Sequence, residues 1–168
     1  LAAMFSYRAL NLYGLIICVA SLMFAILYLE RTLFLDPCPL CILDRLVIVL
    51  LGIVFLTALV HNPGLLFAKI YGLLLIIFCL IGIGLASRHI WLQNLPKDKV
   101  PECGADLYFM LDTLPLFDAI QKALSGSGSC ADVSWTFAGL AIPEQTLILF
   151  VGLLIISVVQ AVRPRGSI

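Results

Sequence analysis

Cys38 and Cys41 form a Cys-x-x-Cys motif, the pattern with the clearest chemistry in this 168-residue sequence. Two such thiols can close into a disulfide and reopen, and in doing so they carry two electrons. Pro39 follows Cys38 directly, and proline is favoured at the first position of a helix because its missing N–H group is not needed there. The motif therefore predicts Cys38 at a helix N-cap and Cys41 in the first turn. At that end the unpaired N–H groups and the helix dipole lower the pKa of a thiol.

Two further cysteines, Cys103 and Cys130, have 26 residues between them. Four cysteines allow three disulfide connectivities. Because a Cys-x-x-Cys pair can close on itself, we expect a resting state with one disulfide inside the motif and the other between Cys103 and Cys130. A zinc site built from the four cysteines is the alternative, but structural zinc usually draws its ligands from two close-set pairs. No metal is therefore predicted.

Three polar residues are candidates for binding a ligand near the motif. Arg45 lies four residues beyond Cys41 on the same helical face, where its permanent charge could hold an anion near the sulfur. The alternative is that Arg45 only marks the end of an apolar helix. His89 and Gln93 are also four apart and share a helix face, so they either contact a ligand or anchor the helix at a membrane boundary.

The elements that must position these residues are long apolar blocks. Of all residues, 62% are hydrophobic and 12% charged, whereas a soluble domain has about 25% charged residues. A hydrocarbon layer about 30 Å thick needs about 20 helical residues. The blocks predict one membrane domain over residues 1–168, with transmembrane helices at about 9–29, 42–60, 70–87 and 145–162. The predicted fold is an all-α membrane protein, an antiparallel four-helix transmembrane bundle, with Cys18 and Cys79 as packing residues inside it.

Basic residues near the helix ends predict the orientation, because short cytoplasmic segments carry an excess of them. Four of them fall on one side: Arg8, Lys69, Arg163 and Arg165. The second outer loop, at about 88–144, carries four positive and seven negative charges. Both termini are therefore predicted in the cytoplasm. The outer loops, at about 30–41 and 88–144, are predicted on the opposite side, where a bacterial periplasm or another oxidising extracytoplasmic space lets disulfides persist.

The second outer loop contains an apolar stretch from Leu107 to Leu124 with helical spacing. It predicts a short interfacial helix with Pro115 near its start, which either covers the bundle or steers the loop that carries Cys103. Residues 125–129 read Ser-Gly-Ser-Gly-Ser, the composition of a flexible linker. We expect mobility just before Cys130.

Several function classes find no support in the sequence. The formal net charge is zero and no basic run is present, so nucleic acid is not an expected partner. The sequence has no glycine-rich phosphate loop and only two histidines, which leaves little basis for nucleotide or hydrolase chemistry.

The order of these features resembles the disulfide bond formation protein B (DsbB) family. The resemblance covers most of the chain and rests on four spans, on Cys38-x-x-Cys41 followed by Arg45, and on Cys103 and Cys130 in the second outer loop. Further residues that carry it are His89, Gln93, Ser127-Gly128-Ser129-Cys130-Ala131-Asp132, Trp135, Phe137, Gly139-Leu140 and Pro143. The family pattern leads us to expect an aromatic residue just after Pro143, where this chain has Glu144 and Gln145.

The resemblance implies a thiol:quinone oxidoreductase of the bacterial inner (cytoplasmic) membrane. Such an enzyme reoxidises a periplasmic thioredoxin-like dithiol protein of the DsbA type and passes two electrons to the membrane quinone pool. The implied cofactor is a quinone, either ubiquinone or menaquinone, and the implied surroundings are the lipid bilayer.

The resemblance also implies roles for single residues. The partner's thiolate attacks Cys103, and Cys130 is the leaving thiol. Cys130 or Cys103 then attacks the disulfide of Cys38 and Cys41, and the resulting Cys41 thiolate interacts with the quinone. Arg45 is expected to stabilise negative charge on the quinone oxygen. His89 and Gln93 are expected at the same site.

Two other readings of the sequence stay open. One is a four-span scaffold without enzymatic activity, in which both disulfides only staple the outer loops and resist reduction. The other is an oxidase of the vitamin K epoxide reductase type, which is also a helical bundle with paired cysteines and a quinone. The position of the Cys-x-x-Cys motif in the first outer loop resembles DsbB more closely.

Overall fold

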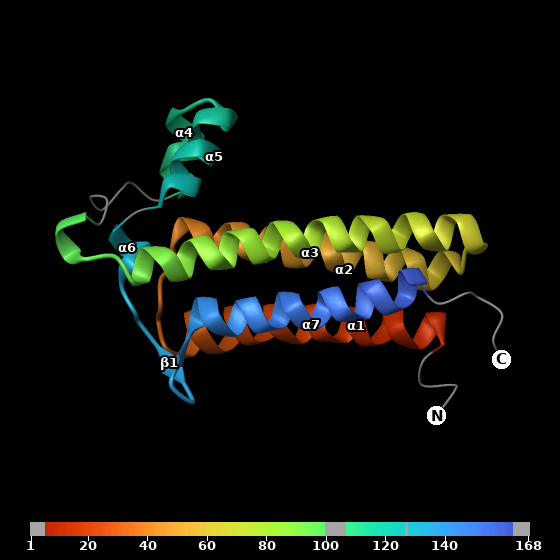
Figure 1. The fold of residues 1–168 in the computed structure, drawn as a ribbon. Coiled ribbons are helices and arrows are strands. Elements are labelled where there is room, and N and C mark those ends of the chain that lie inside the picture. Colours follow the sequence, from red (N-terminus) through yellow and green to blue (C-terminus); the bar gives the residue numbers. More distant parts are fainter. Residues whose placement is uncertain (1–5, 100–106, 127, 163–168) are drawn as a thin grey trace.

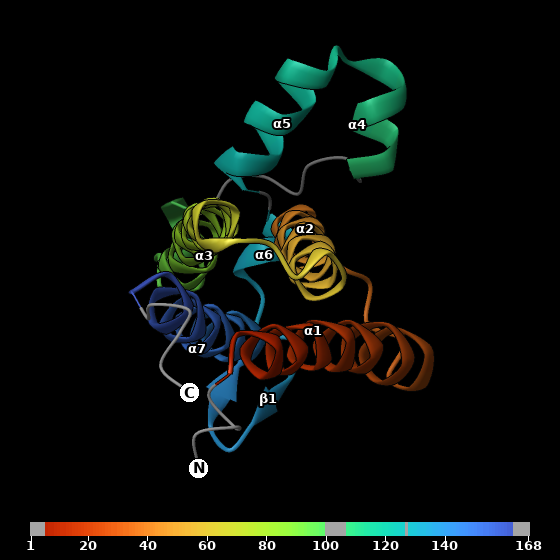
Figure 2. The ribbon, with the colours of Figure 1, turned by 90° about the vertical axis from the view of Figure 1, so that its right-hand side faces the viewer.

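Four long helices dominate the computed structural model, which describes residues 6–99, 107–126 and 128–162. Helix α1 (Tyr7–Met23) continues into the π-helix η2 (Phe24–Thr32), and the other three are α2 (Pro39–His61), α3 (Leu65–Gln93) and α7 (Ile142–Val162). They run antiparallel to one another along the chain order (Figure 1) and form a bundle when viewed end-on (Figure 2). By length and composition all four could cross a membrane. The predicted all-α four-helix membrane fold is confirmed.

The helix ends follow from local sequence signals. Ser6 caps α1, and its hydroxyl accepts a hydrogen bond from the N–H of Ala9. Helix α2 ends at Asn62, which adopts the left-handed conformation with φ 42°. Its N–H donates to the carbonyl of Ala58, a common way to close a helix. Gly64 then begins α3, so only a tight turn separates these two helices.

The bundle core is formed by large apolar side chains from three helices and by two cysteines. Phe55 of α2 and Phe150 of α7 are fully buried in it. Cys18 and Cys79 are buried in the same cluster, which agrees with their predicted packing role. The opposite faces of these helices expose leucine, isoleucine and valine side chains. Such exposed apolar faces suit a protein that is surrounded by lipid.

Two glycines let aromatic side chains enter the helix contacts. A Cβ atom added at Gly82 would lie 2.4 Å from the ring of Phe150, and one added at Gly14 would lie 2.5 Å from the ring of Phe55. Both distances are shorter than van der Waals contact. The two rings therefore fill space that any other residue type would occupy.

We expect Gly82→Ala to lower the free energy of unfolding by about 1–3 kcal/mol, because the added methyl group overpacks the contact with Phe150. Gly84→Ala is the matched control on the same helix, since nothing lies within 4 Å of its added Cβ. Unfolding of both variants in detergent, followed by circular dichroism, measures the difference. Equal stabilities would contradict this packing.

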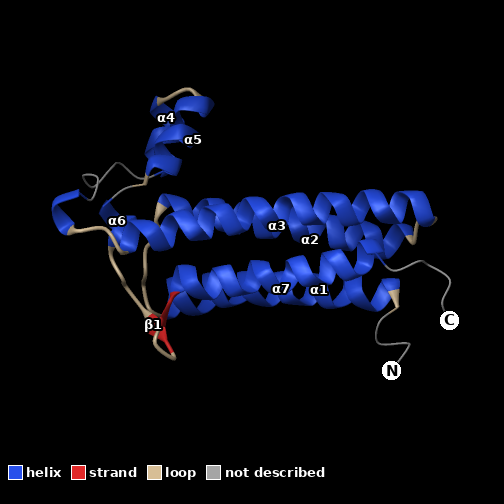
Figure 3. Ribbon diagram, in the orientation of Figure 1, coloured by secondary structure: helices blue, strands red, loops and turns tan. Residues whose placement is uncertain are grey.

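The second outer loop contains more structure than predicted (Figure 3). Its elements are η3 (Lys97–Lys99), α4 (Leu107–Thr113), α5 (Leu116–Ser125), α6 (Gly128–Ala131) and a hairpin of β1 (Thr136–Phe137) and β2 (Leu140–Ala141). The short helix predicted within 107–124, with Pro115 near its start, is present as α5, for which Pro115 is the N-cap residue. Helix α4, which precedes it in the same stretch, was not predicted. Helices α4 and α5 lie outside the four-helix bundle on the side of α2 and α3 (Figure 2), and α5 contacts α2.

The described residues of the predicted linker before Cys130 lie against the bundle. Gly126 has φ 85°, and a Cβ added there would lie 2.3 Å from Leu92, so the chain passes very close to α3 at this glycine. Gly128 begins α6, which packs against α2 and α3. The described residues of this stretch therefore bring Cys130 to the end of the bundle.

Candidate functional site

The Cys-x-x-Cys motif stands at the start of α2, as predicted. Cys38 is the N-cap residue, and its Sγ accepts a hydrogen bond from the N–H of Cys41 at 3.4 Å. The two Sγ atoms lie 3.1 Å apart as thiols. Cys38 is 7% exposed, whereas Cys41 is half-buried and lines a cavity. Closing the disulfide therefore needs only a small movement of the two side chains.

Cys130 lies against this motif although it is far away in sequence. Helix α6 places it in a buried cluster with Cys38, Leu40 and Leu92. Hydrogen bonds with the thiols of Cys130 and Cys41, followed by burial, raise the pKa of Cys38. The predicted low pKa is therefore wrong for Cys38 in this reduced arrangement, because neighbouring thiols and desolvation outweigh the helix start.

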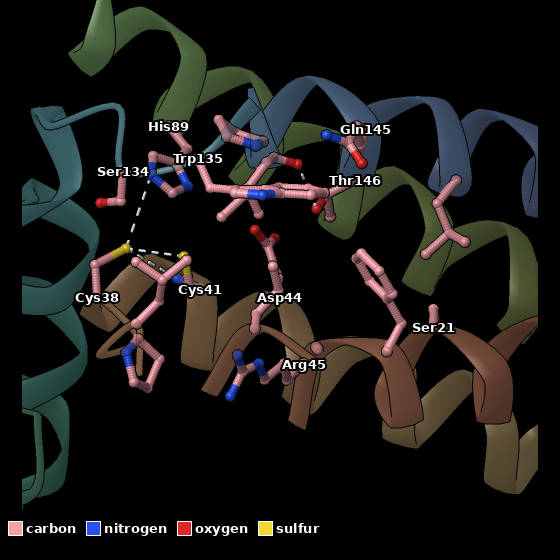
Figure 4. Close-up of a pocket in the computed structure, with 18 of the residues that line it drawn as sticks. Ser21, Cys38, Cys41, Asp44, Arg45, His89, Ser134, Trp135, Gln145 and Thr146 are labelled. Atoms are coloured by element: carbon pink, nitrogen blue, oxygen red, sulfur yellow. Dashed lines mark hydrogen bonds between the residues drawn. The ribbon is translucent and has the colours of Figure 1, made fainter. Parts of the chain in front are cut away.

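His89 approaches the same sulfur from the last turns of α3. Its Nε2 lies 3.7 Å from Sγ of Cys38 (Figure 4), and the side chain is 3% exposed. Gln93, one turn further, is half-buried, and its amide donates to the carbonyl of Asp132 at 3.5 Å. The predicted shared face of His89 and Gln93 thus points toward the motif.

A cavity of about 290 Å³ opens beside Cys41 at this end of the bundle. Its walls come from η2, α2, α3, α7 and the segment before the β-hairpin. Its polar lining includes Cys41, Asp44, Arg45, His89 and Gln93, and its apolar lining includes Phe24, Ile48 and Leu149. Cys38 also lines this cavity. Five predicted site residues therefore share it: Cys38, Cys41, Arg45, His89 and Gln93.

Arg45 and Asp44 are oriented differently in this cavity. The guanidinium of Arg45 forms an ion pair with Glu30 of η2, and Figure 4 shows it extending away from Trp135. The carboxyl group of Asp44 points toward Trp135 instead. Asp44 is 4% exposed, and its Oδ1 has no hydrogen-bond partner among the described residues. Sequence reasoning did not select Asp44, although an acidic residue inside an apolar span is a signal of function.

Trp135 covers the cavity as part of an aromatic cluster that sequence reasoning did not group. Its ring contacts those of Phe24 and Tyr28 from η2, with ring centroids 5.9 and 6.0 Å apart, and it stacks on Phe137 of β1. These contacts fix the hairpin against η2. After Pro143, where the family pattern predicts an aromatic residue, this chain has Glu144. Its carboxylate accepts a hydrogen bond from the N–H of Ala141 at 2.9 Å, next to the start of α7.

Comparison with known proteins agrees with this arrangement. Residues 7–160 match the family of disulfide bond formation protein DsbB. The chain belongs to the DsbB family. It is 48% identical over 158 residues to the disulfide bond formation protein B of Saccharophagus degradans, covering 94% of this chain and 95% of that protein. It is 46% identical to that of Nitrosococcus oceani, covering 96% and 95%.

Family membership makes this a membrane disulfide bond formation protein, a disulfide-forming oxidoreductase. Of the four cysteines predicted for the DsbB chemistry, the structure gathers Cys38, Cys41 and Cys130. Cys103 lies outside the described residues, and its pairing with Cys130 stays a prediction. The adjacency of Cys38 and Cys130 is the contact that sequence spacing alone did not reveal.

Proposed function

We propose that this DsbB-family protein oxidises a periplasmic thioredoxin-like dithiol protein of the DsbA type and transfers the electron pair to a membrane quinone. The observation that carries the proposal is the position of the thiols. Cys130 contacts Cys38 on the outer side of α2, whereas Cys41 faces the cavity. Electrons that arrive from the outer loop can therefore leave through a different sulfur at a different surface.

The cavity supports a quinone as the acceptor. Its volume of about 290 Å³ lies near the lower end of the range of about 300–1,000 Å³ for small-molecule sites. Apolar walls suit the ring, while N–H groups of His89 and Gln93 and the unpartnered Asp44 carboxyl are available for its oxygen atoms. A bound quinone would supply a lipid-soluble acceptor for two electrons and two protons.

The proposed relay passes electrons from Cys130 through the Cys38–Cys41 motif to the acceptor. In the proposed relay the Cys130 sulfur attacks Sγ of Cys38 in the closed motif, which forms the Cys38–Cys130 disulfide and releases Cys41 as a thiolate. Because Cys41 lines the cavity, its electron pair then faces the acceptor. The partner's second thiol displaces Cys103, and the Cys103 thiolate then recloses with Cys130, which frees the Cys38 thiolate. Transfer of one electron pair to the acceptor then recloses the Cys38–Cys41 disulfide. Each partner dithiol thus gives up two electrons and two protons overall.

We propose the bacterial inner membrane as the location, with both termini in the cytoplasm. Arg8 is at the start of α1, and the π-helix that continues α1 lines the cavity. Lys69 is in the second turn of α3, whose last turns carry His89. These basic residues therefore mark the end of the bundle opposite the cysteines, which supports a periplasmic site under the positive-inside rule.

The test is quinone reduction by the purified full chain in detergent. A reduced thioredoxin-like dithiol protein is the electron donor, ubiquinone or menaquinone analogues are the acceptors, and the loss of quinone absorbance is followed for the intact chain and for Cys103→Ala. We expect catalytic reduction that is lost in the variant. A folded protein that reduces neither quinone with several donors would favour the scaffold with structural disulfides.

Arg45→Ala is expected to raise the KM for quinone about 10-fold or more, because a charge-assisted contact at the cavity is lost. The rate of disulfide exchange with the partner should change less than about two-fold, since the Cys130 side of the motif is untouched. Arg31→Ala is the matched control, as Arg31 is exposed on η2 and does not line the cavity. An unchanged KM for Arg45→Ala would remove Arg45 from the quinone site.

A further inference from the structure

The reduced motif gathers ligand atoms of the two kinds that zinc prefers. Sγ of Cys38, Sγ of Cys41 and Nε2 of His89 all lie within 4.8 Å of one another. Sulfur and imidazole nitrogen are the usual ligands of zinc in proteins. Cys130 lies in the same buried cluster as Cys38 but is not among these three mutually close ligand atoms. We propose that the reduced chain binds one Zn²⁺ ion through Cys38, Cys41 and His89, with water as the fourth ligand, and that the Cys38–Cys41 disulfide excludes the ion.

The observed distances are close to those of a tetrahedral site. With Zn–S of about 2.3 Å and Zn–N of about 2.0 Å, tetrahedral ligands are separated by about 3.8 Å for two sulfurs and about 3.5 Å for sulfur and nitrogen. The contact from Cys38 Sγ to His89 Nε2 is 3.7 Å. The Sγ atoms of Cys38 and Cys41 are 3.1 Å apart, so they must separate by about 0.7 Å to reach the tetrahedral distance. Cys41 is half-buried and borders the cavity, which leaves room for that movement.

The surroundings of the ligand atoms suit a bound metal ion. The N–H of Cys41 already donates to Sγ of Cys38, a hydrogen bond that stabilises a metal-bound thiolate. Leu40 and Leu92 close the buried side, and the cavity provides the entry path. Since α2, its N-cap residue and α3 supply the ligands, no long loop has to be ordered when the ion binds.

Zinc binding and oxidation of the motif exclude each other, because both use the sulfur atoms of Cys38 and Cys41. Zinc binding converts the two thiols of Cys38 and Cys41 to thiolates and releases two protons, and the His89 ring binds in its neutral form. Forming the Cys38–Cys41 disulfide removes two electrons and both thiolate ligands. Zinc should therefore stabilise the reduced form. The site is independent of which acceptor takes the electrons, so it does not depend on the proposed quinone activity.

The experiment measures metal binding directly on the full chain. The protein is reduced, freed of reductant without oxygen and titrated with Co²⁺. We expect one equivalent to give the strong visible bands of tetrahedral cobalt and thiolate-to-metal charge transfer, and Zn²⁺ to displace it. Competition with a chromophoric chelator then gives the zinc affinity. The same chain with its cysteines oxidised is the control without any substitution, and we expect its affinity to be at least about 100-fold lower.

Variants identify the ligands. Cys41→Ser and His89→Ala should each weaken zinc binding about 100-fold, and Cys41→Ser should also lower the charge-transfer intensity from two thiolates to one. Cys18→Ser and Cys79→Ser are the matched controls, because both cysteines are buried in the bundle core. They should bind within about two-fold of the intact chain. Equal affinity of the oxidised chain, weakly coloured octahedral cobalt, or full affinity in His89→Ala would overturn the proposal.

Discussion

Replacing Cys41 by serine is expected to lower quinone reduction by the partner dithiol at least about 1,000-fold, as for the loss of a nucleophile in other enzymes. Cys41 is the only cysteine among the described residues that lines the cavity together with Cys38. A serine hydroxyl at this position can neither form a disulfide with Cys38 nor release an electron pair. The loss should therefore affect turnover with any donor, including a small dithiol such as dithiothreitol.

The control for this variant is Cys79→Ala in α3. Cys79 is fully buried in the bundle core, away from the cavity lining. It should lose some stability through its small cavity but keep turnover within about two-fold. Rates are compared at equal amounts of folded protein, judged by circular dichroism. More than a tenth of normal turnover in Cys41→Ser would contradict the role of Cys41.

The bundle was predictable because its signals are local. Each apolar block is long enough to cross a hydrocarbon layer, and Pro39 marks the start of α2 at the predicted residue. Neither inference needs to know what the segment packs against. The same holds for His89 and Gln93, whose spacing fixes a shared face on any α-helix.

The outer elements were harder to predict because their signals are unusual or distant. The β-hairpin turns through Ala138 with φ 54° and Gly139 with φ 81°. Two positive φ values are typical of a tight hairpin turn, but alanine rarely occupies the first of them. Without an asparagine or aspartate there, the short strands gave no recognisable pattern.

The partner of Arg45 depends on a feature that sequence periodicity does not show. Residues Phe24–Thr32 are π-helical, and the wider turn changes which side chains of this segment face α2. Glu30 reaches Arg45 from that segment. Arg45 therefore forms an ion pair with Glu30, whereas the carboxyl group of Asp44, one residue earlier, faces the cavity.

Only the family resemblance pointed to the contact between Cys38 and Cys130; spacing and periodicity could not predict it, because it joins residues from two different loops. Helix α6 brings Cys130 to the end of the bundle, and Gly126 permits the close passage over Leu92. No periodic pattern encodes such an approach between distant segments. It is nevertheless the contact on which electron transfer between the two cysteine pairs depends in the proposed relay.

Cys130→Ser is therefore expected to lower turnover with the protein partner about 1,000-fold by a different route from Cys41→Ser. The Cys38–Cys41 motif stays intact, but the sulfur beside Cys38 is gone. The mixed disulfide of the reduced partner with Cys103 should not form, because Cys103 then has no disulfide with residue 130 for the partner's thiolate to attack. Non-reducing gel electrophoresis and intact mass test for this complex.

A small dithiol separates the two variants, because it can reduce the Cys38–Cys41 disulfide without help from the outer loop. With dithiothreitol as donor, Cys130→Ser should retain quinone reduction within about ten-fold of the intact chain, whereas Cys41→Ser should remain inactive. If Cys130→Ser were equally inactive with dithiothreitol, Cys130 would act at the motif itself rather than as the carrier between the two pairs. If it were fully active with the protein partner, Cys103 would deliver the electrons to Cys38 directly.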